Sequence, residues 1–255
     1  MDIRGRVALV VGGGSGMGQL AARRWSEAGG VAVAADIDDE GLRATAAGCD
    51  SVHTRHLDVA DAAAVEVLIK DVEAEHGPIE RVYNAAAIQP TRLLLEQDLA
   101  EIHRVMQINY GGLVNVSVTA LPRLLERGRG SLINFCSIAG WVPNMHFGAY
   151  SASKFAAVAF TEVLYHENRG KGVHIACVCP SQVDTPLRAQ AQSKPKIMET
   201  GPKPMDPGRV LDAIDRAVAK NQFWVFPGLH TAIGVRLRRF LPAFLWQVGH
   251  RAEGF

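Results

Sequence analysis

The stretch VALVVGGGSGMG, residues 7–18, decides the fold that this 255-residue sequence predicts. Five apolar residues at positions 7–11 predict a buried strand, and the glycines that follow predict a tight turn. Apolar side chains from Leu20 to Ala28 then recur near the helical spacing, and Gly29-Gly30 predicts the end of that helix. A strand, a glycine turn and a helix in this order are typical of the first unit of an α/β sheet.

The alternation of strand and helix patterns continues along the chain. Because crossovers between parallel strands are right-handed and carry their helices over the sheet, this alternation predicts helices on both faces. We therefore predict an α/β fold, a Rossmann-type doubly wound parallel sheet of about seven strands in a single domain. The further predicted strands are residues 31–35, 51–56, 81–85, 131–136, 173–179 and 223–226, and the further predicted helices are residues 61–76, 99–126, 150–168 and 208–220.

Two segments depart from this alternation. Between Pro180 and Pro207 the pattern weakens, and residues 186–206 are predicted to form a mobile substrate loop rather than a domain boundary. The Rossmann domain is therefore expected to span residues 1–228. In residues 229–255 apolar side chains recur at helical spacing among arginines, and Pro242 breaks or kinks the helix. We expect this amphipathic tail to pack on the domain or on an oligomer partner, with peripheral membrane contact as the less favoured alternative.

The composition argues against several classes of protein. A net charge of +1 gives no electrostatic reason to expect nucleic acid as a partner. The N-terminus lacks the apolar stretch of a signal peptide and no apolar run reaches about 18 residues, so the default expectation is a cytoplasmic location. Cys177 and Cys179 lie in a strand-like run, which favours core packing over metal binding, and no metal site is expected.

The glycine turn is suited to a dinucleotide. Gly12, Gly16 and Gly18 lie between the first strand and the first helix, where glycine permits a tight turn and the close approach of a pyrophosphate. The free N–H groups of the helix N-terminus then face the phosphates. A glycine cluster alone fits a plain turn equally well.

Asp36 strengthens the cofactor interpretation. It ends the second strand, 18 residues after Gly18, where a carboxylate accepts hydrogen bonds from the hydroxyls of the adenosine ribose. A carboxylate there repels a 2′-phosphate, and the glycine loop carries Ser15 and Met17 instead of a basic residue, which favours NAD over NADP. The alternative is that Asp36 caps a helix starting near Asp39, and the two roles are compatible.

Two further pairs follow predicted strands. Asp58-Val59 comes after the third strand, where a side chain reaches the adenine, and Asn84-Ala85 comes after the fourth, where small residues admit the dinucleotide. Ligands of open α/β sheets bind outside the carboxyl ends of the strands, so all these residues are expected at one cleft.

Tyr150 and Lys154 are the candidate acid–base pair. They lie four residues apart on a predicted helix and so share one face. A lysine ammonium, together with a positive nicotinamide ring, is expected to lower the tyrosine pKa so that the phenolate accepts a proton from an alcohol. Ser137, at the end of the fifth strand, is placed to hydrogen-bond the substrate oxygen. By itself a Tyr–Lys spacing of this kind is equally consistent with an exposed helical pair.

Asn109 is a further candidate because asparagine is unfavourable inside a helix. A local kink beside Gly111-Gly112 is a structural alternative. Between Ser137 and Tyr150, the apolar residues of the segment 141–147 indicate a hydrophobic substrate. His146 in that segment fits an exposed or loop-bonding role better than proton transfer.

In the order and spacing of these motifs, residues 5–228 resemble a classical short-chain dehydrogenase/reductase. The resemblance implies a catalytic tetrad of Asn109, Ser137, Tyr150 and Lys154, in which the lysine also binds the nicotinamide ribose and the asparagine holds a water. It implies that Thr185 contacts the carboxamide. Val11, Ala86 and Ser181 depart from the usual family pattern. The cofactor-binding residues expected from the sequence and the resemblance together are Gly12, Ser15, Gly16, Met17, Gly18, Asp36, Asp58, Val59, Asn84, Ala85, Tyr150, Lys154, Pro180, Val183 and Thr185.

The sequence thus predicts an NAD-dependent oxidoreductase that interconverts a secondary alcohol and a ketone on a hydrophobic small molecule. The resemblance adds an expectation of a homodimer or homotetramer. Two alternatives stay open at this point: an inactive NAD-binding sensor or scaffold, and a reductase of a C=C or C=N bond. A nucleotide-sugar epimerase or dehydratase is disfavoured because such chains carry a longer C-terminal domain and a differently spaced glycine loop.

Overall fold

The computed structural model describes residues 3–193, 195–196 and 203–254, and these contain one parallel seven-stranded sheet. Its order is β3-β2-β1-β4-β5-β6-β7, so the chain reverses its direction of progress after β3. That reversal opens a crevice at the carboxyl ends of β1 and β4. The predicted doubly wound α/β fold is confirmed. The strands are β1 (Val7–Val11), β2 (Val31–Asp36), β3 (Val52–His56), β4 (Ile79–Asn84), β5 (Ser131–Phe135), β6 (His174–Val178) and β7 (Trp224–Val225).

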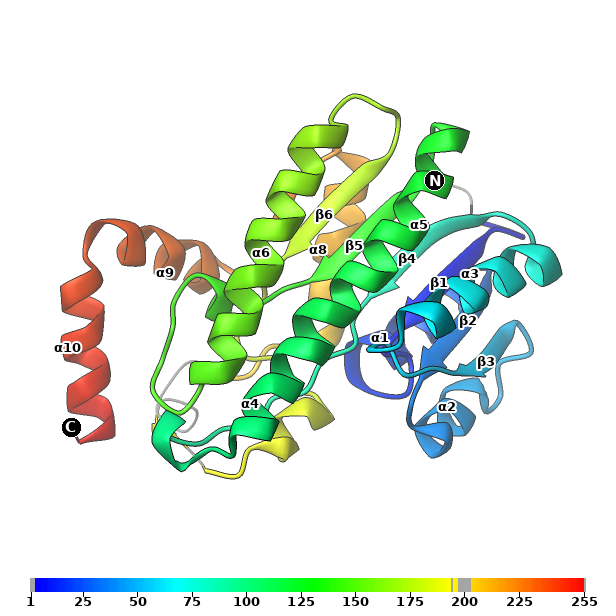
Figure 1. Ribbon diagram of the computed structural model, residues 1–255. Helices are drawn as coiled ribbons and strands as arrows, with labels where there is room; N and C mark the ends of the chain where they lie inside the picture. The colour runs from blue at the N-terminus through cyan, green and yellow to red at the C-terminus, as the bar shows by residue number, and fades with distance from the viewer. Residues whose placement is uncertain (1–2, 194, 197–202, 255) are drawn as a thin grey trace.

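Helices cover both faces of the sheet (Figure 1). Side chains alternate along each strand, so Leu9 and Val11 of β1 point to one face, and Ala8 and Val10 point to the other. One core cluster joins the first face to α3, α5 and α6, and a second joins the other face to α1, α2 and α8. The helices of the domain are α1 (Gly16–Glu27), α2 (Asp39–Ala46), α3 (Ala62–His76), α4 (Leu99–Met106), α5 (Leu113–Arg127), α6 (Gly148–Asn168) and α8 (Pro207–Ala219).

The predicted long helix at residues 99–126 is interrupted in its middle. Residues Gln107–Gly112 form η2, a π-helical segment between α4 and α5. The expected kink beside Gly111-Gly112 is therefore a change of helical winding, in which one turn is widened. The helix α2 begins at Asp39, where the capping alternative expected a helix, but its N-cap is Asp38 and not Asp36: Oδ1 of Asp38 accepts hydrogen bonds from the N–H groups of Glu40 and Gly41.

The predicted substrate loop, residues 186–206, begins as the short helix η4 (Pro186–Gln190). Residues 194 and 197–202 of that loop lie outside the described residues, as do 1–2 and 255. Three hydrogen bonds tie Ser193 to Thr91, between 2.7 and 3.0 Å. The described part of the loop is therefore fastened to the segment that follows β4.

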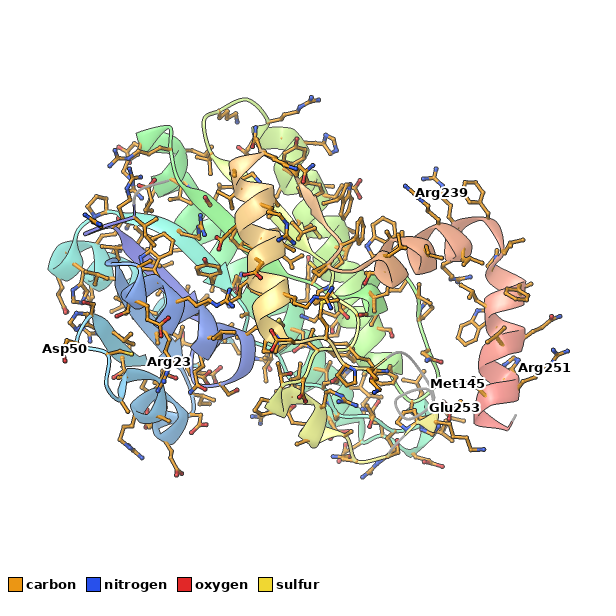
Figure 2. All side chains as sticks on the ribbon, turned by 180° about the vertical axis from the view of Figure 1, so that it is seen from behind. Arg23, Asp50, Met145, Arg239, Arg251 and Glu253 are labelled. Atoms are coloured by element: carbon orange, nitrogen blue, oxygen red, sulfur yellow. The ribbon has the colours of Figure 1, made fainter. Side chains whose placement is uncertain are left out.

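The tail forms two helices that project from one end of the domain, α9 (Leu229–Phe240) and α10 (Pro242–Glu253) (Figures 1 and 2). Pro242 starts α10 because proline is tolerated in the first turn, where its missing N–H has no helical partner. Thr231 is buried and donates to the carbonyl of Pro227 at 2.8 Å, and α9 contacts η3 (Ile138–Gly140). The tail is thus joined to the domain beside the turn that follows β5. In the described part of the chain, no helix combines the length and apolar character needed to cross a bilayer.

Candidate functional site

The glycine loop is held together by close backbone contacts. A Cβ atom added to Gly18 would lie 2.0 Å from the carbonyl oxygen of Gly12, and one added to Gly12 would lie 2.5 Å from the N atom of Ala86. Gly12 also has φ +83°, in the region that favours glycine. The N-cap of α1, Ser15, makes no side-chain capping bond. The first-turn N–H groups of α1 are therefore available to an anion.

Asp36 faces this loop. Its Oδ2 accepts a hydrogen bond from the N–H of Gly14 at 2.9 Å, and its Oδ1 accepts one from the N–H of Asp38 at 3.1 Å. The alternative in which Asp36 caps the following helix is wrong, because Asp38 occupies the N-cap of α2. The two backbone donors hold the Asp36 carboxylate at the carboxyl end of β2, beside the start of α1.

A cavity of about 280 Å³ runs along this edge of the sheet. Ten of the expected cofactor-binding residues line it: Gly12, Ser15, Gly16, Met17, Gly18, Asp36, Asp58, Val59, Ala85 and Thr185. Further residues that line the cavity were not predicted from the sequence. One of them, the exposed Ile37, could have been found, because it is an apolar side chain directly after a strand end. Also missed were Asp38, Leu57, Ala86, Ala87, Ile88, Arg104, Ile108, Leu187 and Gln190.

Three expected cofactor residues have other contacts. The Asn84 side chain is buried and donates to the carbonyl of Leu113 at 3.0 Å and to Oδ1 of Asn134 at 3.2 Å. It therefore ties β4 to α5 and β5. Val183 packs in the core, and the carbonyl of Pro180 accepts from the N–H of Ile138 at 2.9 Å.

The candidate catalytic side chains meet beyond the carboxyl end of β5. Ser137 is the N-cap of η3, and its side chain is near enough to Tyr150 to act on the pKa of the phenol. Lys154, one turn along α6, donates to the carbonyl of Phe135 at 2.9 Å, and its Nζ lies 5.8 Å from the centre of the Tyr150 ring. All three side chains are buried. Tyr150 and Lys154 therefore do not form an exposed helical pair.

The electrostatics of this group differ from the sequence expectation. Burial raises the pKa of Tyr150 to about 12, although the nearby Ser137 side chain opposes that rise. Burial lowers the pKa of Lys154, because removal from water disfavours the ammonium form. The expected lowering of the Tyr150 pKa by Lys154 is not produced by the protein's own groups. A further positive charge beside the phenol is required to favour the phenolate.

Asn109 lies in the widened segment η2. Its side chain is fully buried, with Oδ1 accepting from the N–H of Ile88 at 2.8 Å and Nδ2 donating to the carbonyl of Ile88 at 2.9 Å. Nδ2 also donates to Oγ of Ser153 at 3.1 Å, and Ser153 precedes Lys154 on α6. Asn109 thus links the cavity wall after β4 to the helix that carries Tyr150 and Lys154. Cys136, Cys177 and Cys179 pack behind this helix, fully or almost fully buried, as the core interpretation predicted.

The segment 141–147 is only partly available to a substrate. Trp141 packs against Trp224 at 5.1 Å and Phe226 at 6.2 Å between ring centres, so its apolar surface belongs to the core. Nδ1 of His146 is hydrogen-bonded to Oγ of Ser193 at 3.1 Å, the loop-bonding role expected from the sequence. Trp141, one of the apolar residues that suggested a hydrophobic substrate, therefore has structural contacts of its own.

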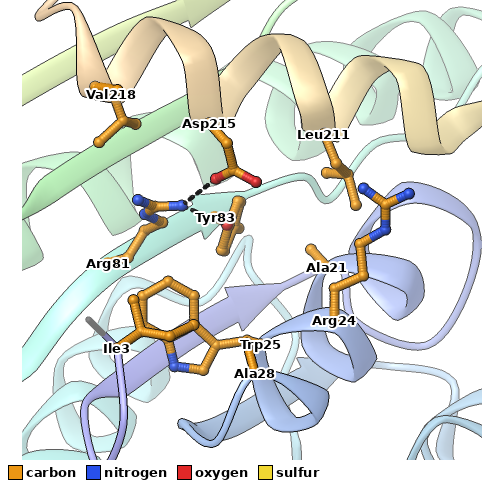
Figure 3. Close-up of a pocket in the computed structure, with 11 residues that line it drawn as sticks. Ile3, Ala21, Arg24, Trp25, Ala28, Arg81, Tyr83, Leu211, Asp215 and Val218 are labelled. Carbon is orange, nitrogen blue, oxygen red and sulfur yellow. Dashed lines mark hydrogen bonds and ion pairs between the residues drawn. The ribbon is translucent and has the colours of Figure 1, made fainter. Parts of the chain in front are cut away.

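A larger cavity, of about 620 Å³, lies between α1, β4 and α8 (Figure 3). Arg81 crosses it, donating to Asp215 Oδ1 at 2.8 Å and to the Tyr83 hydroxyl at 2.9 Å, and it lies over the ring of Trp25 at 5.0 Å. The cavity contains none of the predicted site residues and lies away from the strand ends where they gather. The expected cofactor-binding residues, rather than its size, therefore identify the smaller cavity as the candidate cofactor site, while Asn109, Ser137, Tyr150 and Lys154 are not among the residues that line it.

Comparison with known proteins identifies a protein family that matches the region containing the candidate site. The family model described as short chain dehydrogenase matches residues 6–196. The chain is 38% identical over 188 residues to 2-dehydro-3-deoxy-L-rhamnonate dehydrogenase (NAD(+)) of Sphingomonas sp. (strain SKA58), covering 73% of this chain and 75% of that protein. It is 33% identical over 187 residues to meso-2,3-butanediol dehydrogenase of Serratia marcescens, covering 72% and 74%. A short chain dehydrogenase/reductase from Burkholderia phymatum, solved in complex with NAD, superposes with a TM-score of 0.85 at 25% identity and 96% coverage of both chains.

Proposed function

The chain belongs to the short chain dehydrogenase family, and from that premise we propose that it interconverts a secondary alcohol and a ketone with NAD as the hydride carrier. Relatives that are dehydrogenases of hydroxyl-bearing compounds support an oxidoreductase of the alcohol and carbonyl class. We further propose that this protein uses NAD, that Tyr150 is its acid–base catalyst and that its substrate is hydrophobic.

One observation carries the proposal. The side chains of Ser137 and Tyr150 are buried beside each other, and Nζ of Lys154 lies 5.8 Å from the centre of the Tyr150 ring. A buried tyrosine has no structural need for a neighbouring lysine, which itself loses hydration there. Perturbed titratable groups at the end of a cofactor cleft are typical of catalytic sites.

The proposed roles follow from this arrangement. The glycine loop and Asp36 would hold the dinucleotide, which would supply or accept the hydride and, in its oxidised form, a positive charge. Tyr150 Oη then takes the hydroxyl proton during oxidation, and returns it to the carbonyl oxygen during reduction. Ser137 donates a hydrogen bond to the oxygen on which charge develops. Lys154 stabilises the phenolate by its charge, and Asn109 positions α6 through Ser153.

NAD is proposed over NADP because of Asp36. Its carboxylate accepts backbone hydrogen bonds at the glycine loop and has further lone pairs for ribose hydroxyls. A 2′-phosphate at the same place would meet a negative charge. Arg104, on α4, is a cation at the cavity wall, so a direct test of the preference is needed.

Replacing Asp36 by asparagine is expected to lower the ratio of kcat/KM for NAD to that for NADP by about 10- to 100-fold, because a charge-assisted hydrogen bond is lost and a repulsion removed. Steady-state rates with both cofactors measure the ratio. Asp39→Asn, which removes an exposed carboxylate three residues away, is the matched control and is expected to leave the ratio unchanged. An unaltered ratio in Asp36→Asn would refute the role of Asp36 in selection.

The raised pKa of Tyr150 predicts opposite pH dependence in the two directions. Below its pKa the tyrosine is a phenol, the acid that reduction needs, and above it the phenolate is the base that oxidation needs. Between about pH 6 and 10, kcat/KM for oxidation should therefore rise with pH while that for reduction stays level or falls. Because the nearby Ser137 side chain lowers the pKa of Tyr150, Ser137→Ala should move the rising limb to higher pH. A limb that stays in place in Ser137→Ala would assign the titration to another group.

The decisive assay is a panel of secondary alcohols and ketones, from hydroxy acids and diols to ring and lipid-like alcohols, each with NAD(H) and NADP(H). Turnover of the apolar members supports a hydrophobic substrate, and turnover of the hydroxy acids alone overturns it. Reduction of activated C=C or C=N compounds without alcohol turnover would favour that reaction class. NADH binding without turnover of any member would favour a sensor. Cytoplasmic location and a homo-oligomeric state stay predictions from the sequence.

A further inference from the structure

The tail presents an apolar stripe that the described part of the domain does not cover. We define this tail stripe as the six large apolar residues whose exposed fractions lie between 42% and 75%. In α9 they recur at intervals of four and seven residues, and from Leu241, the residue before α10, they continue into α10 at intervals of three and four, so each helix carries its share on one side. The tail stripe consists of Leu229, Ile233, Phe240, Leu241, Phe244 and Val248.

The opposite side of the tail fastens it to the domain. Thr231 and Gly249 are its buried residues, and a Cβ added to Gly249 would lie 3.3 Å from Cε of Met145. A carboxylate oxygen of Glu253 accepts from the N–H of Lys196 at 3.0 Å. With both helices anchored on this side, the tail stripe faces outward. Among the described residues, the tail therefore contacts its own domain through one side of each helix.

Positive charge accompanies the tail stripe. Arg236, Arg238, Arg239 and Arg251 lie in residues 229–255 with a single acid, Glu253, so this segment has a net charge of +3 and the remainder of the chain −2. No Asp or Glu occurs from residue 216 to residue 252. Within the described ranges none of these four arginines forms an ion pair. Figure 2 shows Arg239 and Arg251 on the outer side of the tail.

From the exposed stripe and its charge we propose that the tail is a docking element for an anionic lipid surface. Apolar side chains enter the boundary between headgroups and acyl chains, while the arginines meet the negative headgroups. A two-fold contact with the tail of a second copy would instead bring two segments of charge +3 together. Because α9 packs against η3, which follows Ser137, a lipid surface bound there lies beside the site from which a hydrophobic substrate would be taken. The lipid contact itself rests on the tail alone and not on the proposed function.

The experiment is cosedimentation of the full-length protein with vesicles of phosphatidylcholine, and of phosphatidylcholine and phosphatidylglycerol in equal parts. We expect binding to the anionic vesicles, weak binding to phosphatidylcholine, and release as salt rises. Phe240→Ser with Phe244→Ser should weaken binding at least tenfold. Arg236→Gln, Arg238→Gln and Arg239→Gln together should weaken it about 100-fold, since each basic residue near an anionic surface is worth about 1 kcal/mol.

Matched controls separate placement from composition. Val67→Ser with Leu95→Ser removes two exposed apolar side chains elsewhere, and Arg43→Gln, Arg169→Gln and Lys220→Gln together remove the same charge from the domain. Both controls should bind vesicles within about twofold of the unchanged protein. Circular dichroism and thermal melts of every variant check that the domain remains folded.

Three outcomes overturn the proposal. The first is an unchanged protein that ignores anionic vesicles, and the second is tail variants that bind as the controls do. The third combines two results: no protein binds vesicles, and the molecular mass measured by light scattering falls in the variant that carries Phe240→Ser and Phe244→Ser. That outcome would assign the tail stripe to a contact with a second copy. Turnover and NADH binding are measured alongside. Their loss with vesicle binding intact counts against the proposed function alone.

Discussion

Tyr150→Phe is expected to lower kcat by about 10²- to 10⁴-fold and to leave NADH binding unchanged, because it removes the one atom proposed to carry the proton. The phenylalanine ring keeps the volume of the tyrosine and its edge contact with Phe147, whose centre lies 6.4 Å away. The lost hydroxyl leaves Ser137 with its bond from the N–H of Ala139, so the turn at η3 is retained. A loss of turnover is therefore expected without a loss of the fold.

The measurement pairs steady-state turnover with NADH titration by fluorescence. Tyr165→Phe is the matched control, since Tyr165 lies on the same helix and stacks on Phe223 at 4.3 Å, away from the site. Its turnover should equal that of the unchanged protein. If Tyr150→Phe turned over as fast as Tyr165→Phe, Tyr150 would not be the acid–base group, and a sensor would gain support only if both variants and the unchanged protein were inactive.

Gly18→Ala should have the second large effect, a loss of NADH affinity of at least 100-fold with a destabilisation of about 1–3 kcal/mol. The added Cβ would lie 2.0 Å from the carbonyl oxygen of Gly12 and 3.2 Å from the Cα of Gly13. Because these are backbone atoms of the same turn, the turn itself must move. Its displacement carries the N–H groups at the start of α1 away from the position that a pyrophosphate requires.

Urea denaturation measures the change in the free energy of unfolding, and NADH titration of the folded protein measures the change in affinity, so the two effects are separated. Gly111→Ala is the control, because the nearest atom to its added Cβ is the carbonyl oxygen of Met106 at 3.9 Å. That change should alter the free energy of unfolding by no more than about 1 kcal/mol, since alanine suits a helix better than glycine. A Gly18→Ala protein that binds NADH as tightly as Gly111→Ala would contradict the role of the loop.

The buried position of Tyr150 also has a consequence for stability. Its pKa is raised in the folded protein, so the phenol form favours folding. Below about pH 10, the pKa of a tyrosine in the unfolded chain, the side chain is a phenol in both states and its titration does not change the free energy of unfolding. As pH rises from there through about 12, the unfolded chain ionises first, so the free energy of unfolding falls. Any loss of activity above about pH 10 must therefore be separated from unfolding.

Local patterns carried most of the prediction. Short-range spacing in the sequence was enough to predict three features: the apolar run of β1, the glycine turn and the position of Asp36 at the end of β2. Each of them depends on backbone conformation and strand order. For the same reason the four-residue separation of Tyr150 and Lys154 identified one helical face. A helix near Asp39 was considered only with Asp36 as its cap, whereas Asp38 caps α2. Two acids separated by one residue at a strand end cannot be told apart without the turn that orients them.

What the sequence by itself determined is the α/β order, the glycine loop and the residue types at the ends of the strands, since each depends on neighbours in the chain. Only the tertiary structure decided that Asn109 bonds Ile88 and Ser153, that Trp141 packs on Trp224, and that burial raises the Tyr150 pKa to about 12. It also decided which side of the tail is covered. The physical reason is that hydrogen-bond partners, ring contacts and loss of water are set by segments distant in sequence, and periodicity within one helix does not contain them.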